Sequence, residues 1–276
     1  MHHPLFESLV LPLLLSLVAI GLFRRLVGPR HAAAGFGLAV LLATLWMVGL
    51  AERPAGVMQK LPWIFAGAWL LGTALDAGTA SRQLQWLGLT CGWIAACWWL
   101  GTRGTLPGIS YGVAGAWVLG CLLRTPDDRS DAATAAVVAS LGLAGVCFVA
   151  GSLALFQLAV LLAAAVSGLA LWLWPKPRVS FGATSVAVAG VAWLALAQAT
   201  LLLVPARPPA LALLAASFVT APLLAQLWPA SRPRSRPLAV ALLTAILAAG
   251  ALALQGAGGS NGASIEPGRD DGYYRQ

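Results

Sequence analysis

The sequence predicts an all-α fold, a polytopic transmembrane helix bundle of about ten spans with short loops. Hydrophobic residues make up 59% of the 276 residues and charged residues only 9%, whereas soluble domains carry about 25% charged residues. Ten stretches are apolar over roughly the 20 residues that a membrane-crossing helix needs. Because backbone groups exposed to lipid must be satisfied internally, such stretches are expected to be helices.

The first predicted span covers about residues 4–23 and ends at Arg24 and Arg25. A secretory signal carries its positive charge before the apolar stretch, so we interpret this segment as an uncleaved span. The next four spans are predicted near 31–50, 61–77, 84–100 and 109–123.

An apolar stretch continues from Ala132 to Trp174. As one helix it would be about 65 Å long, twice the hydrocarbon thickness of about 30 Å. We therefore predict a tight hairpin that turns at Gly151 and Ser152. The spans of this half are predicted near 132–150, 152–174, 182–204, 210–228 and 238–255. Residues 1–255 thus form one transmembrane domain, and residues 256–276, rich in Gly, Ser and Asn, are predicted to be a flexible tail.

The basic residues predict the orientation of the chain. Eleven Lys and Arg residues lie on the side of the loops that follow spans one, three, five, seven and nine, and six lie on the other side with both termini. The positive-inside rule then places both termini outside. Arg greatly outnumbers Lys and Ala is abundant, which indicates a bacterial source, so we expect a bacterial cytoplasmic (inner) membrane with periplasmic termini.

Small residues recur four apart in the fourth and fifth spans. Such spacing lets two helix backbones approach closely. Three interpretations remain open: a tight antiparallel pair of these spans, a face for homo-oligomerisation, or coincidence in a chain rich in Gly and Ala. The helix-packing residues concerned are Gly88, Gly92 and Ala96, and Gly112, Ala116 and Gly120.

Two acids lie within predicted spans, both near an end. Ionisable residues in membrane segments are the usual indicators of function. Glu7 lies in the first turn of span one, and Asp76 lies at the end of span three, six residues before Arg82. Each is interpreted either as an interfacial acid with a nearby counter-charge or as a site at one mouth of a pathway.

The remaining candidate pathway residues are neutral. Gln198 and Gln226 are strongly polar groups in or near spans, and Pro222 interrupts span nine close to Thr220. Interhelical hydrogen bonding is the ordinary role of such amides. The alternative is that these residues surround a narrow polar cavity at the bend that Pro222 makes.

Two polar loops have simpler interpretations. Ser130 or Asp131 is predicted to cap the sixth span. The basic segment 232–237 is predicted to hold its loop inside and to approach anionic lipid.

Several classes of function lack the residues they require. The histidines are His2, His3 and His31, so the predicted membrane core offers none for a catalytic triad or metal site. The four cysteines lie in apolar stretches and form no CxxC pair, and no phosphate-binding loop or GxSxG motif is present. Basic residues are dispersed, which disfavours nucleic acid as a partner. We therefore expect that the protein is not an enzyme and that it binds no cofactor.

Two functional hypotheses remain. The first is a permease-like protein that handles a small or lipophilic molecule, which is based on the number of spans, the kinking prolines Pro12 and Pro222 and the absence of a soluble domain. No acid or histidine lies at a predicted bilayer centre, which argues against coupling to ions. The second is a non-catalytic accessory or assembly subunit of a membrane complex, with a membrane protein or a second copy as its partner besides the lipid bilayer. The two halves show no matching loops or motifs that would indicate a repeat.

Overall fold

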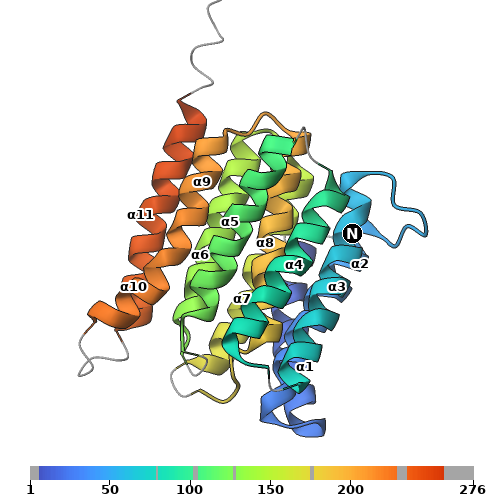
Figure 1. The fold of residues 1–276 in the computed structure, drawn as a ribbon, viewed down its shortest axis with the longest axis vertical. Coiled ribbons are helices and arrows are strands. Elements are labelled where there is room, and N and C mark those ends of the chain that lie inside the picture. Colours follow the sequence, from blue (N-terminus) through green and yellow to red (C-terminus); the bar gives the residue numbers. More distant parts are fainter. Residues whose placement is uncertain are drawn as a thin grey trace, which may run out of the picture.

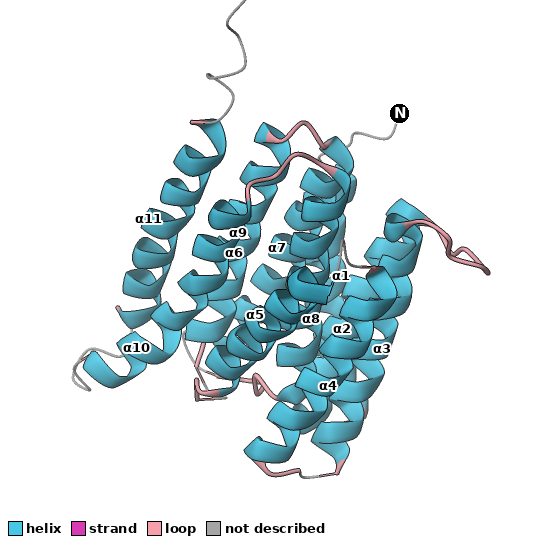
Figure 2. Cartoon of the chain, turned by 45° about the horizontal axis from the view of Figure 1, so that its top comes forward, coloured by secondary structure: helices cyan, strands magenta, loops and turns pink. Residues whose placement is uncertain are grey.

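The computed structural model describes residues 6–78, 80–101, 105–126, 129–174, 177–228 and 235–257, without the side chains of Glu7, Arg30 and Thr105. Within these residues the regular structure is entirely helical (Figure 2). The all-α prediction is therefore confirmed for the described chain.

The helices of the first half begin after a π-helical turn at Phe6–Val10. A 3-10 turn at Pro29–His31 separates the first two of them. They are α1 (Leu11–Leu26), α2 (Ala33–Val48), α3 (Val57–Ala77), α4 (Arg82–Leu100) and α5 (Thr105–Leu123).

The second half contains a broken helix. A 3-10 turn at Ser217–Val219 separates α9 from α10, and Pro222 explains the break because proline cannot donate to the carbonyl four residues earlier, that of Phe218. The helices are α6 (Asp131–Val149), α7 (Leu153–Leu173), α8 (Ala183–Leu203), α9 (Pro208–Ala216), α10 (Thr220–Leu227) and α11 (Arg236–Gly256).

The α6–α7 connection is a tight reversal. Gly151 has a φ of +85°, a conformation that favours glycine. The Ser152 hydroxyl then accepts a hydrogen bond from the Leu155 amide at 3.4 Å and caps α7. The long apolar stretch from Ala132 to Trp174 is thus two antiparallel helices.

Seven helical segments are long and apolar enough to cross a membrane, which indicates a multi-pass membrane protein. The predicted count of about ten spans is not established by this finding. Helices α2, α3 and α4 are not among these seven segments. Helix α2 has only 16 residues, a length of about 24 Å, and α3 and α4 are long enough but less apolar than the seven segments. The seven segments are Ser8–Leu26, Leu106–Leu123, Asp131–Val149, Leu153–Leu173, Ala183–Leu203, Pro208–Leu227 and Arg236–Gly256.

Helix α8 is the centre of the bundle. Every residue from Ala183 to Thr200 is buried, and α8 packs against α2, α3, α4, α5, α6 and α7. The closest approach is to α3, where a Cβ on Gly72 would lie 2.6 Å from the Thr184 Cα. Small residues thus let the neighbours enclose α8 tightly.

The other helices, apart from α3, form three groups. Helix α1 packs on α2 and α7, α4 pairs with α5, and α9, α10 and α11 pack with α6. Figure 1 shows the helices running side by side, with their ends gathered above and below. Arg25, Arg82 and Arg124 lie at the lower end of the bundle, so we call this end the basic side. It holds the C-termini of α1, α3, α5, α7 and α10.

Candidate functional site

A groove runs along the seam between α4 and α5. A cavity of about 660 Å³ lies at its basic-side end, and a second cavity of about 320 Å³ continues along the same two helices. Val113 and Ala116 line both, so we treat the two cavities as one feature, the α4–α5 groove. The first half is lined by Arg82, Gln83, Trp86, Trp117, Gly120, Cys121, Leu123 and Arg124, and the second by Thr90, Ile94, Cys97, Trp98, Gly108, Ile109 and Gly112.

Tryptophans of α4 lie against glycines of α5 and hold the two helices together. The buried Trp93 indole donates to the Tyr111 carbonyl at 2.9 Å and fills the space beside Gly115, where a Cβ would overlap its ring. The Trp86 indole donates to the Ala116 carbonyl at 3.2 Å. These contacts fix the seam from which the groove opens.

The basic-side end of the groove is positively charged. Arg82 donates to the carbonyls of Leu123 and Thr125 and so caps the last turn of α5. Arg124 and Gln83 are exposed beside it. In the described chain, two arginines and no acidic residue line this half of the groove.

The second half of the groove is uncharged and mostly apolar. Ile94, Trp98 and Ile109 present exposed hydrocarbon along it. Thr90 lines this half near the middle of α4, but its hydroxyl oxygen is buried and has no hydrogen-bond partner in the described structure. The groove therefore combines a cationic end with an apolar body.

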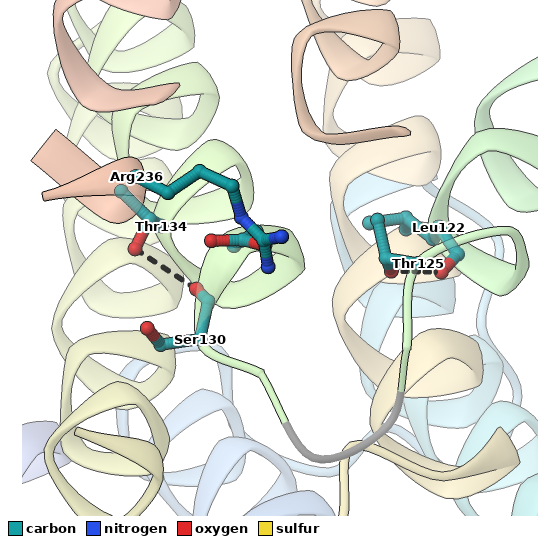
Figure 3. A network of polar contacts seen from close by, with 6 residues as sticks. Leu122, Thr125, Ser130, Thr134 and Arg236 are labelled. Carbon is teal, nitrogen blue, oxygen red and sulfur yellow. Dashed lines mark hydrogen bonds and ion pairs between the residues drawn. The ribbon is translucent and has the colours of Figure 1, made fainter. Parts of the chain in front are cut away.

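A buried ion pair joins α6 and α11 on the basic side. Arg236, the first residue of α11, contacts the carboxylate of Asp131, the first residue of α6. Asp131 is 1% exposed and Arg236 is 6% exposed. Figure 3 shows the Arg236 side chain reaching toward α6 near Ser130 and Thr134.

This pair changes two interpretations of the polar loops. Ser130 is the residue that precedes α6, but its side chain makes no capping hydrogen bond, and Thr134 donates to its carbonyl at 2.9 Å. Arg236 is buried against Asp131 rather than directed to a lipid surface. The rest of the basic segment, 232–234, lies outside the described residues.

Asp76 caps a helix. Its carboxylate accepts hydrogen bonds from the Ala183 amide at 2.9 Å, the Thr184 amide at 2.9 Å and the Thr184 hydroxyl at 2.5 Å. A carboxylate at a helix N-terminus also complements the helix dipole. Asp76 therefore has a structural role that links the end of α3 to the start of α8. The backbone of Glu7 lies in the π-helical turn, and its side chain lies outside the described part.

The structure does not bring the neutral candidates together. The Gln198 amide donates to the carbonyls of Cys97 at 3.1 Å and Gly101 at 2.9 Å, at the end of α4. Thr220 instead pairs with Thr244 of α11 at 2.8 Å. Gln226 is exposed on α10, and Pro222 is buried at the helix break.

The predicted packing glycines contact two different helices. A Cβ on Gly92 would lie 2.7 Å from Leu71, and one on Gly88 would lie 3.5 Å from Leu75, both residues of α3. Ala96 lines a groove with α3 as well.

The small residues of α5, in contrast, contact α4. A Cβ on Gly120 would lie 3.2 Å from Trp86, and one on Gly112 would lie 3.8 Å from Ile94. Ala116 accepts the Trp86 hydrogen bond. The small faces of α4 and α5 therefore do not meet each other.

Sequence reasoning missed the residues that give the groove its character, namely Arg82, Arg124, Trp86, Trp117 and Thr90. Arg82 starts α4 and Arg124 follows α5, so adjacent antiparallel helices bring both to one side. That adjacency was the available signal, because consecutive helices usually pack together.

The fold and its apolar surface define a multi-pass membrane protein. No family model matches the chain, and no curated protein shows significant similarity to it.

Proposed function

We propose that this protein is a permease-like membrane protein that takes a lipophilic molecule from the lipid phase and passes it along the α4–α5 groove. The groove itself supports the proposal, because exposed residues such as Trp98, Val113 and Trp117 line it and it follows most of the length of two helices. Its volume is within the range of about 300–1,000 Å³ typical of small-molecule sites. The bundle centre, in contrast, is filled by α8.

The proposed transport is not coupled to ions. Three ionisable side chains at helix ends have structural partners in the described chain. Asp76 caps α8, Asp131 pairs with Arg236, and Lys60 donates to the Trp99 carbonyl at 2.7 Å. Ion coupling usually needs titratable groups deep in the membrane. We place the protein in the bacterial inner membrane, with about ten spans and both termini periplasmic.

Blocking the groove tests this function. Val113 lines both halves of the groove and is 65% exposed, and Leu242 on α11 is 66% exposed. We expect Val113→Trp, but not the matched control Leu242→Trp, to slow transbilayer movement of a fluorescent single-chain lipid in vesicles containing the purified protein. Equal rates for protein-containing and protein-free vesicles would contradict the proposal.

An accessory role is the second candidate. Trp98 is 59% exposed, Trp117 is 50% exposed and Ile109 is 61% exposed along α4 and α5, so this edge offers a large apolar surface for a membrane partner. Purification from native membranes in mild detergent tests it. A stoichiometric partner that Val113→Trp displaces would favour this role over transport.

A further inference from the structure

The arginine end of the α4–α5 groove has the chemistry of an anion site. Arg124 and Gln83 are exposed donors beside Arg82. A guanidinium group binds phosphate or carboxylate through charge-assisted hydrogen bonds. The described lining contains no acid that would oppose an anion there.

The length of the groove fits a hydrocarbon chain. Arg124 and Gly108 mark its two ends near α5, and their separation of 16 positions corresponds to about 24 Å of helix. One leaflet of the hydrocarbon core is about 15 Å thick. The apolar walls therefore extend past the middle of the membrane, where the Thr90 hydroxyl lies.

We propose that the groove binds an anionic amphiphile, with its phosphate or carboxylate at Arg124 and Gln83 and its hydrocarbon chain between Trp86 and Trp117. This inference rests on the proposed function and names its substrate class. Charge complementarity at one end selects the headgroup, and the uncharged body accepts the chain.

Charge complementarity favours an amphiphile over an apolar helix of a partner protein. Arg124 and Gln83 are exposed donors at one end of the groove. An anionic headgroup supplies acceptors for these donors, whereas an apolar helix does not.

Binding to the delipidated full-length protein in detergent tests the proposal by native mass spectrometry. The probes are phosphatidic acid and phosphatidylcholine with identical chains, and inorganic phosphate as a competitor. Arg25→Gln is the control for Arg124→Gln, because Arg25 is also an exposed arginine on the basic side but lies outside the groove.

We expect phosphatidic acid to bind more tightly than phosphatidylcholine, and Arg124→Gln to weaken phosphatidic acid binding about tenfold, the effect of losing one charge-assisted hydrogen bond. Arg25→Gln should leave the affinity for phosphatidic acid unchanged, and Val113→Trp should weaken the binding of both lipids. Inorganic phosphate at the same concentration should not compete, because it lacks the chain.

Equal affinities for the two lipids, or equal losses in Arg124→Gln and Arg25→Gln, would overturn the proposal. Full competition by inorganic phosphate would show an anion site without a chain and would overturn it too, as would normal lipid binding to Val113→Trp. Selective binding without lipid movement would refute the transport function alone. Lipid movement without charge selectivity would refute this inference alone.

Discussion

Asp131 and Arg236 place two opposite charges almost completely out of water at the ends of α6 and α11. Removing one partner of a buried pair leaves the other charge uncompensated, which costs about 3–5 kcal/mol. We therefore predict that Asp131→Asn and Arg236→Gln each lower the thermal unfolding midpoint of the purified protein in detergent.

The double variant Asp131→Asn with Arg236→Gln distinguishes the interaction between the two side chains from the contribution of each side chain alone. Because Asp131→Asn with Arg236→Gln leaves no buried charge at this contact, its midpoint should lie above that of Arg236→Gln alone. Additive losses in the double variant would show that the two side chains do not stabilise each other.

At the residue scale, the sequence identified polar groups but not their partners. The sequence shows Asp76 as an acid at the end of a span, but the helix whose amides it accepts from lies far along the chain, so its capping role is not visible there. Its partners Ala183 and Thr184 follow more than 100 residues later. A Cβ on Gly182 would lie 2.8 Å from the Asp76 carboxylate, so the fit depends on packing that no local pattern encodes.

At the scale of the helices, the α4–α5 pair has two nearby glycines, Gly112 and Gly115, that differ sharply in the space available for a side chain. A Cβ at Gly115 would overlap the Trp93 ring, whereas a Cβ at Gly112 would lie 3.8 Å from Ile94, at ordinary contact distance. We predict that Gly115→Ala displaces Trp93 and destabilises the pair by about 1–3 kcal/mol, as overpacking does. Gly112→Ala, one turn away, should be nearly neutral.

Two measurements check this difference. The unfolding midpoint in detergent should fall in Gly115→Ala only, and the protein with that change should bind less lipid in the groove because α4 and α5 move apart. Equal midpoints for Gly115→Ala and Gly112→Ala would show that the seam is loosely packed.

The positions of the helices were easier to predict than their contacting faces. Apolar length placed a helix in each of the predicted ranges. The four-residue spacing selects Gly112, Ala116 and Gly120 as packing residues. The tightest approach of α5 to α4 is instead at Gly115, the residue directly before Ala116. The spacing of residues along a helix shows which of them share a face of that helix. Which neighbouring helix that face contacts depends on the packing of the whole bundle. Pro222, in contrast, acts locally, so its helix break was predictable.

At the scale of the whole molecule, hydrophobicity alone does not fix the number of crossings. Seven segments satisfy the length and apolarity that a span requires, and α2 is shorter. Helix α2 nevertheless packs between α1, α3, α7 and α8, and Gly35 lies so close to α1 that a Cβ would overlap the backbone there. Helix α2 is therefore an integral part of the bundle, although it is shorter than the roughly 20 residues of a typical span.

If the chain crosses the membrane ten times, as proposed, the distribution of charge predicts its orientation. Eleven Lys and Arg residues against six favour the basic side as cytoplasmic, and an even number of crossings puts both termini on the opposite side. We predict that alkaline phosphatase, which is active only outside the cytoplasm, is active when fused at either terminus of the chain expressed in bacteria. A fusion at Arg129, on the basic side, should be inactive. Termini on opposite sides would require an odd number of crossings, as in a chain in which α2 alone, or α2, α3 and α4 together, do not cross.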